Sequence, residues 1–281
     1  MTVSRRPFLE KLTKHLLLVP FLLFALFPFY HMTLTSLKQD RELYDRHAVP
    51  LVITQGPTFE HYSKLLWDTE FLIWTKNSLL VTGLSTVVSV VLGTIAAYAL
   101  ARLKFAGVAA LGTGIFVTYL VPTSLLFLPL AQIITWIGMG DSKWALVLTY
   151  PTFLVPFCTW LLIGYFRTVP KEIEECAMVD GATRIQALWR IVLPIAVPGL
   201  VCAALFAFTL SWNEFLYALT FTSSSEQITA SVGVTTELIR GDIYFWGQLM
   251  AGALLGSIPV ALVYSFFVEY YVTGLTGSVK G

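Results

Sequence analysis

The stretch EECAMVDGATRIQALWRIVLPIAVP, residues 174–198, is polar and helix-like, and it ends in two prolines, Pro194 and Pro198. It interrupts an otherwise apolar chain. Of the 281 residues, 56% are hydrophobic and only 12% are charged, whereas an ordinary soluble domain carries about 25% charged residues. This chain has too little polar surface to cover a soluble core, so its composition indicates an integral membrane protein.

Six apolar runs are long enough to span a membrane: residues 15–36, 77–101, 108–132, 143–166, 196–220 and 248–271. A spanning segment must satisfy its own backbone hydrogen bonds, and runs of this length do so as helices. No small-residue cleavage site follows the first run, so we interpret it as a retained span rather than a signal peptide. The expected fold is an all-α membrane protein with six transmembrane helices.

The distribution of Lys and Arg predicts the orientation of these spans. Most of the 18 basic residues fall in the segments that lie inside if the N-terminus is inside, which places both termini in the cytoplasm. Residues 1–14 and 272–281 are then cytoplasmic ends, 37–76 is a long and partly folded outer loop, and 167–195 is the long inner loop. An interfacial belt of tryptophans at the outer edges fits this topology; its members are Trp67, Trp74, Trp136, Trp144 and Trp246.

The inner loop predicts two short helices that meet at Gly181. The first begins after Pro170 and runs to about Asp180, where Gly181 supplies a left-handed turn. Thr183 and Gln186 have the spacing of a capping box for the second helix. That helix has one apolar face, made by Ile185, Leu188, Ile191 and Val192. By spacing alone, the segment is either a docking element or an amphipathic connector lying on the membrane surface.

Particular residues of this loop resemble a known motif. Glu175-Cys176-Ala177, Asp180-Gly181-Ala182, Ile191-x-Leu193-Pro194 and Pro198 resemble the EAA loop of ABC importer permeases. Cys176 departs from the motif, since alanine usually stands there, but cysteine is also small. The resemblance continues in Asn77-Ser78, in Ala97 to Arg102, in Trp212 to Phe215 and in the tail from Gly274 to Gly281. Together these resemble the permease subunit of maltose-type carbohydrate importers.

The resemblance implies a type I ABC importer transmembrane domain, with its core at 77–271, in the cytoplasmic membrane of a bacterium or archaeon. The loop would couple this chain to a separate ATPase through Glu175, Cys176, Ala177, Asp180, Gly181 and Ala182. The implied partners are a second permease in a heterodimer, two copies of the ATPase and an extracytoplasmic sugar-binding protein. ATP and Mg would be bound by the ATPase, with no cofactor on this chain. Gly277 and Lys280 would reach the ATPase, unless the tail is simply a frayed terminus.

Trp212, Asn213 and Glu214 are candidates for the translocation path. An acid flanked by apolar residues within a span usually faces a cavity or the interior of the bundle. A carboxylate at the wet interface and a tryptophan anchor remain the alternatives. The expected cargo is a disaccharide or oligosaccharide, or a related glycoside or polyol.

The sequence contains no sign of chemistry of its own. It has no G-x-x-x-x-G-K-[ST] loop for phosphates and no nucleophile–base constellation. Cys158, Cys176 and Cys202 lack metal-ligand spacing and predict no disulfide, and a net charge of +1 does not point to nucleic acid. An ion-coupled carrier would require inverted repeats and charges at the midplane, which we do not find. A non-transport scaffold would leave the inner loop unexplained.

Overall fold

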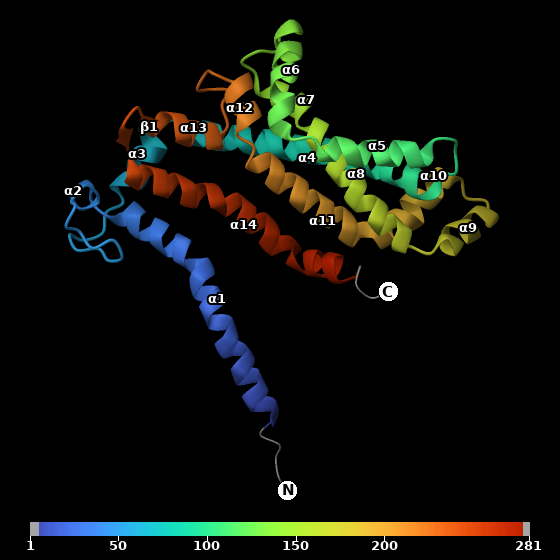
Figure 1. Cartoon of the computed structure of the whole chain (residues 1–281), viewed down its shortest axis with the longest axis horizontal. Helices are drawn as coiled ribbons and strands as arrows, with labels where there is room; N and C mark the ends of the chain where they lie inside the picture. Colours follow the sequence, from blue (N-terminus) through green and yellow to red (C-terminus); the bar gives the residue numbers. More distant parts are fainter. Residues whose placement is uncertain (1–5, 278–281) are drawn as a thin grey trace. The chain divides into compact units, whose positions relative to one another are not determined.

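The computed structural model describes residues 6–277 of the chain, and their side chains over 14–270. The helices are α1 Arg6–Leu37, α2 Asp40–Leu43, α3 Glu60–Trp67, α4 Phe71–Arg102, α5 Val108–Leu120, α6 Thr123–Trp136, α7 Lys143–Thr149, α8 Pro151–Thr168, α9 Lys171–Val179, α10 Arg184–Ala187, a π-helical segment Leu188–Val192, α11 Leu193–Trp212, α12 Leu216–Phe221, α13 Ala230–Glu237 and α14 Trp246–Gly277, with short strands β1 Ile239–Arg240 and β2 Ile243–Tyr244 (Figure 1). The expectation of an all-α membrane fold is confirmed.

The chain divides into two compact units. Unit 1 comprises residues 1–71 and 234–257, and unit 2 comprises residues 72–233 and 258–281. Three helices, α4, α13 and α14, pass from one unit into the other.

Five helical stretches within the described residues are long and apolar enough to cross a membrane, and the bent pair α5–α6 makes a sixth if it counts as one span. The five are Lys14–Leu37, Phe71–Arg102, Lys143–Thr168, Arg184–Trp212 and Trp246–Tyr270. Each overlaps one of the predicted spans, and all five are longer than the predicted run.

Two predicted spans are interrupted. The run 108–132 is not one helix, because α5 and α6 meet at an angle of 94°. Pro122 causes the break: it lacks a backbone N–H, and its ring disfavours the helical conformation in Val121, which is extended. The run predicted to continue to residue 220 ends at Trp212, and residues 213–215 separate it from α12.

The core of unit 2 is built on close contact between α8 and α11, which lie side by side (Figure 1). α8 buries one residue per turn, and α11 presents small residues to it. The buried α8 residues are Leu154, Cys158, Leu162 and Phe166, and those of α11 are Ala196, Gly199, Ala203 and Ala207. Small residues let two membrane helices approach closely, and dispersion contacts then hold them together. At Gly199 the contact is so tight that a methyl group would overlap the ring of Tyr165.

The segment between α12 and α13 is fastened to the start of α4. Asn77 Nδ2 donates to two backbone carbonyls of this segment, at 2.8 and 3.0 Å, and Ser78 Oγ accepts from a third residue. Trp74 is 1% exposed and donates its indole N–H to the same segment. It is therefore a structural residue, whereas the other four tryptophans of the predicted belt are exposed. Backbone N–H groups of the segment also bind the Asp141 carboxylate, which lowers the pKa of Asp141.

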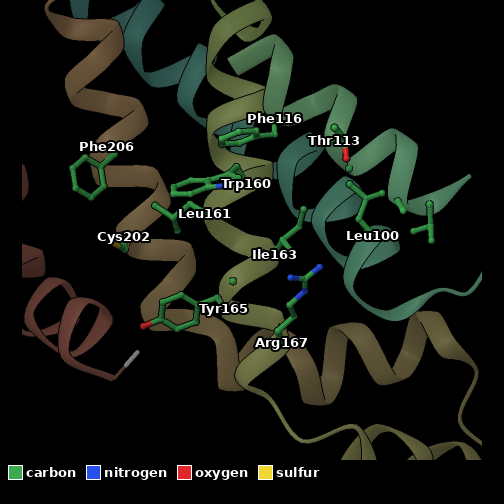
Figure 2. Close-up of a pocket in the computed structure, with 14 residues that line it drawn as sticks. Leu100, Thr113, Phe116, Trp160, Leu161, Ile163, Tyr165, Arg167, Cys202 and Phe206 are labelled. Atoms are coloured by element: carbon green, nitrogen blue, oxygen red, sulfur yellow. The ribbon is translucent and has the colours of Figure 1, made fainter. Parts of the chain in front are cut away.

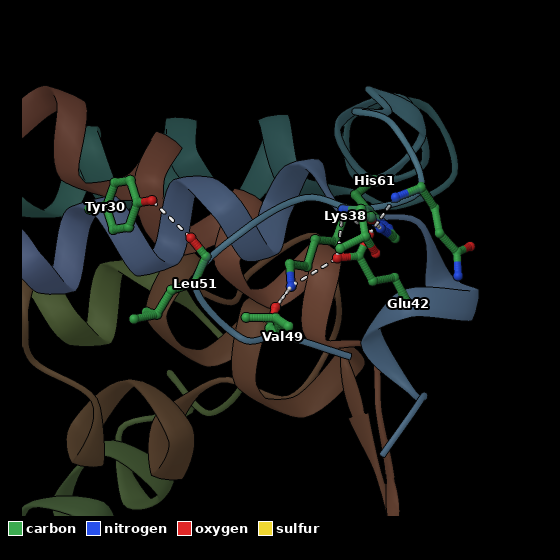
Figure 3. A network of polar contacts seen from close by, with 8 residues as sticks. Tyr30, Lys38, Glu42, Val49, Leu51 and His61 are labelled. Atoms are coloured by element: carbon green, nitrogen blue, oxygen red, sulfur yellow. Dashed lines mark hydrogen bonds and ion pairs between the residues drawn. The ribbon is translucent and has the colours of Figure 1, made fainter. Parts of the chain in front are cut away.

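Unit 1 contains the long first loop, which is partly folded as expected. Its centre is a buried ion pair of 3.0 Å between Lys38 and Glu42. Glu42 also accepts N–H groups from Thr54 and Gln55, and Lys38 donates to the Val49 carbonyl at 2.7 Å (Figure 3). These bonds fold the loop back onto the end of α1. His61 completes the network through the Lys38 carbonyl, at 2.8 Å.

We expect Gly199→Ala to destabilise the bundle by about 1–3 kcal/mol, because the added methyl group overlaps Tyr165 in a packed interface. Gly164→Ala on α8 is the matched control, since a methyl group there meets no atom within 4 Å. The free energy of unfolding in detergent would be measured by denaturant titration. Equal stability of the two variants would contradict the proposed close contact.

We expect Glu42→Gln to destabilise unit 1 by about 2 kcal/mol at neutral pH, because Lys38 loses its counter-charge. Burial alone would raise the pKa of Glu42, but Lys38 and the two loop N–H groups outweigh burial and lower it. A carboxylate whose folded pKa is lowered stabilises the protein above its unfolded pKa, and this contribution is lost as the pH falls through the folded value. Wild-type protein should therefore become protease-sensitive between residues 44 and 58 in acid.

The exposed Glu60, which pairs with Lys64 at 2.7 Å, supplies the control variant Glu60→Gln. Limited proteolysis of the full chain across pH would compare the three proteins. The interpretation of the Lys38–Glu42 pair is wrong if Glu42→Gln is cleaved no faster than Glu60→Gln at neutral pH.

Candidate functional site

The segment predicted to form the inner loop is a helix, a tight turn and a second helix. α9 ends at Val179, and Gly181 has a positive φ of 92°, so the predicted left-handed turn is confirmed. The Gly181 N–H donates to the Met178 carbonyl at 3.1 Å, and the Ala182 N–H donates to the Ala177 carbonyl at 3.0 Å. These two bonds form a Schellman motif, which satisfies the last carbonyls of α9.

The predicted capping box at the start of the second helix is also confirmed. The Thr183 hydroxyl accepts the Gln186 N–H at 3.3 Å, and the Gln186 side chain accepts the Thr183 N–H at 2.8 Å. From Arg184 the chain remains helical to Trp212. Residues 188–192 of this stretch are π-helical, immediately before Pro194, which cannot donate a helical hydrogen bond. The turn therefore leads directly into a membrane-spanning helix.

The predicted coupling residues lie around this turn. Glu175, Cys176, Asp180 and Gly181 are exposed, and Ala177 and Ala182 are half-buried. Of the predicted apolar face of the second helix, Val192 is buried and Ile185 is 70% exposed. Val179 and Trp189 are also exposed, at 87% and 66%. We call Val179, Ile185 and Trp189 the apolar tip. Large apolar side chains exposed on a segment that also carries exposed charges are typical of a surface that another protein covers.

A buried ionic cluster ties α9 to α4, and its residues were not among the predicted sites. Glu174 is 4% exposed, accepts a hydrogen bond from the Tyr98 hydroxyl and pairs with Arg102. Arg102 also donates to the Val169 carbonyl at 2.6 Å. The only signal in the sequence was that Tyr98 and Arg102 stand one helical turn apart at the end of a span.

The three candidate residues for the translocation path make different contacts. Trp212 is 9% exposed and stacks on Phe208. Asn213 is exposed, and its amide donates to the backbone one turn earlier, at 2.9 Å. Glu214 accepts the N–H groups of Tyr217 and Ala218, at 2.9 and 3.1 Å, which caps α12. It also accepts the Tyr150 hydroxyl at 3.0 Å and so faces a neighbouring helix.

An aromatic cavity of about 920 Å³ lies between α5, α8 and α11 (Figure 2). Rings of Phe116, Trp160 and Phe206 line it, together with the polar side chains of Thr113, Tyr165 and Arg167. The ring of Tyr119 stacks on Trp160 with centroids 6.1 Å apart. Flat aromatic faces beside hydrogen-bonding groups can hold a ligand that has both apolar faces and hydroxyls. The aromatic residues come from three separate spans, so no sequence motif pointed to this cavity.

The described residues contain no group of His, Cys, Asp and Glu side chains that could hold a metal ion. Cys158 and Cys202 are buried and Cys176 is exposed, and all three thiols are free. Of the predicted tail contacts, Gly277 is the last residue of α14, and Lys280 lies outside the described residues.

Comparison with known proteins gives consistent matches. Residues 89–276 match the family model described as "Binding-protein-dependent transport system inner membrane component". The chain is 38% identical over 264 residues to the inner membrane ABC transporter permease protein YcjP of Escherichia coli (strain K12), covering 93% of each chain. It is 34% identical over 279 residues to the trehalose/maltose transport system permease protein MalG of Thermococcus litoralis, covering 97% of this chain and 99% of MalG.

Among solved structures, the chain resembles a crystal structure of a bacterial ABC transporter involved in the import of the acidic polysaccharide alginate. The TM-score is 0.78 at 23% identity, and the match covers 96% of this chain and 99% of that one. At this identity the likeness concerns the fold, which is that of an ABC importer permease.

Proposed function

The chain belongs to the family of binding-protein-dependent transport system inner membrane components, and we propose that it is the permease subunit of an ATP-driven sugar importer. It is a multi-pass protein of the cytoplasmic membrane. The observation that carries the proposal is the turn at Gly181. It joins two capped helices, exposes the apolar tip, and is followed by a helix that continues directly into a span. A rigid, partly apolar projection of this kind suits docking on another subunit.

The other subunits follow from this role. A cytoplasmic ATPase, present in two copies, binds ATP and Mg. It contacts the turn of this chain at Glu175, Cys176, Ala177, Asp180, Gly181 and Ala182. It also contacts the tail at Gly277 and Lys280. A second permease completes the pathway as a heterodimer, and an extracytoplasmic binding protein delivers the sugar. The bias of Lys and Arg supports cytoplasmic termini.

The proposed cargo is a disaccharide, an oligosaccharide or a related glycoside or polyol. Named relatives support this class: besides the trehalose/maltose permease, a diacetylchitobiose permease of Streptomyces coelicolor is 33% identical. The aromatic cavity supports it too, because sugar rings present apolar faces and hydroxyls to aromatic and polar side chains.

The test is purification of the tagged chain in mild detergent from cells that express its neighbouring genes. Partners would be identified by mass spectrometry, and ATPase activity would be assayed with binding protein and with maltose, trehalose or diacetylchitobiose. Recovery of an ATPase and a second permease, with sugar-stimulated hydrolysis, is the expected result. Recovery of the chain alone would contradict the proposal and favour an ion-coupled carrier or a scaffold.

We expect Gly181→Trp and Glu175→Lys to lower sugar uptake about tenfold or more, with normal amounts of chain in the membrane. A tryptophan at positive φ costs about 1–3 kcal/mol of backbone strain and reshapes the turn. Uptake and ATP hydrolysis in proteoliposomes would be measured together. Glu60→Lys, a matched charge reversal at an exposed residue of α3 in unit 1, is the control. Wild-type uptake by both turn variants would argue against docking.

We expect Asn213→Ala, Glu214→Ala and Trp160→Ala to alter transport rate or sugar preference, each by about tenfold for a lost hydrogen bond or stacking contact. Because Glu214 also caps α12, Glu214→Gln is a further variant: it removes the charge of the side chain but keeps an oxygen that can accept the N–H groups of α12. Competition between labelled and unlabelled sugars would give the preference. If Asn213→Ala and Glu214→Ala leave transport rate and sugar preference unchanged, these residues do not line the translocation path. An effect of Trp160→Ala alone would place the translocation path in the aromatic cavity.

A further inference from the structure

Helix α9 is connected to the membrane bundle by two kinds of route. One is covalent: α8 precedes it across Val169 and Pro170, and through the turn it continues into the helical stretch that ends at Trp212. The other is the buried cluster of Tyr98, Arg102 and Glu174, which joins α9 to the end of α4. The second route is independent of the first, because α4 stands 69 or more residues earlier in the chain, counted from Arg102 to Lys171.

The contacts of the cluster hold α9 to the end of α4. Glu174 lies in the first turn of α9, and its carboxylate accepts a hydrogen bond from the Tyr98 hydroxyl. The same carboxylate forms an ion pair with the Arg102 guanidinium, whose Nε lies 3.5 Å away and makes no hydrogen bond. The same guanidinium donates Nη2 to the carbonyl of Val169, in the linker before α9, at 2.6 Å. Arg102 thus holds two points of the α8–α9 corner, the Glu174 carboxylate and the Val169 carbonyl, with one planar group.

Burial makes these contacts strong and selective. Tyr98, Arg102 and Glu174 are 6%, 9% and 4% exposed, so water cannot easily replace a lost partner. The Tyr98 ring packs edge-on against Phe166 of α8, which holds the hydroxyl in place. Neighbouring acids on α9 lack this environment, because Glu172 and Glu175 are exposed. The burial of Glu174 is therefore specific to this position and is not a general property of the helix.

We propose that Tyr98, Arg102 and Glu174 form a joint that passes displacement of α9 to α4 during transport. This inference rests on the proposed function for its coupling role. Glu174 and its partners are positioning residues: they hold α9 and contact neither the sugar nor ATP. Glu175, next in sequence, faces outward and remains available for the ATPase.

The anchoring part of the proposal can be tested without transport. Cys176 is the exposed cysteine of this chain, two residues from Glu174, whereas Cys158 and Cys202 are buried. A spin label on Cys176 of the full chain in detergent should become more mobile in Glu174→Gln and stay as in wild type in the matched control Glu172→Gln. Unchanged mobility in Glu174→Gln would overturn the joint.

The proposed coupling role is tested with the assembled complex in proteoliposomes. The sugar is whichever of maltose, trehalose and diacetylchitobiose the wild-type complex transports. We expect the Glu174→Gln complex still to hydrolyse ATP, while the amount of sugar taken up per ATP falls about threefold to tenfold. Because loss of a buried counter-charge can unfold a protein, Tyr98→Phe is the second variant: it removes only the hydroxyl and keeps the ring against Phe166. It should lower uptake per ATP in the same direction.

A double-variant cycle distinguishes a joint from general damage. If both residues act through one contact, Tyr98→Phe should add little to Glu174→Gln, whereas its effect should add fully to that of Glu172→Gln. Unchanged uptake per ATP in Tyr98→Phe and Glu174→Gln, with wild type active, would overturn the joint. If wild type transports none of the sugars, the proposed function fails instead, and the spin label still decides whether the anchor exists.

Discussion

The backbone of a membrane-spanning segment must satisfy its hydrogen bonds without water, and the rest of unit 2 depends on this constraint. Long helices meet it by themselves, but this chain interrupts two of them. After Trp212 the first N–H groups of α12 have no helical partner, and the Glu214 carboxylate takes two of them. An acid that would be costly in an apolar run is thus part of what makes the interruption possible.

Close helix packing depends on small side chains rather than on a conventional hydrophobic core. The contact of α8 with α11 combines large side chains on one helix with glycine and alanine on the other. Gly93 of α4 makes a similar approach, since a methyl group there would lie 2.7 Å from Cβ of Cys158. Lipid offers no hydrophobic driving force between helices, so such contacts must provide much of the stability.

Turns and helix caps were predictable from the sequence, whereas contacts between residues far apart in the chain were not. The turn at Gly181 and the Thr183–Gln186 box depend on residues within four positions of one another, so their types and spacing were sufficient. Glu174 looked like one more acid on a polar helix, because its partner Arg102 belongs to another span. Trp74 fitted an interfacial belt by position, but its environment is set by a segment about 150 residues away. The sequence predicted 108–132 as one run, since a proline such as Pro122 indicates a lost backbone hydrogen bond but not the 94° angle at which the two helices meet.

The helical stretch from Arg184 to Trp212 has a mechanical consequence, although five of its residues are π-helical. At about 1.5 Å per residue, its 29 residues extend over about 43 Å. A tilt of about 5° about its Arg184 end would sweep its far end through about 4 Å. A stretch of this length has the proportions of a lever arm: a small rotation beside the turn at Gly181 becomes a larger displacement where Asn213 and Glu214 stand.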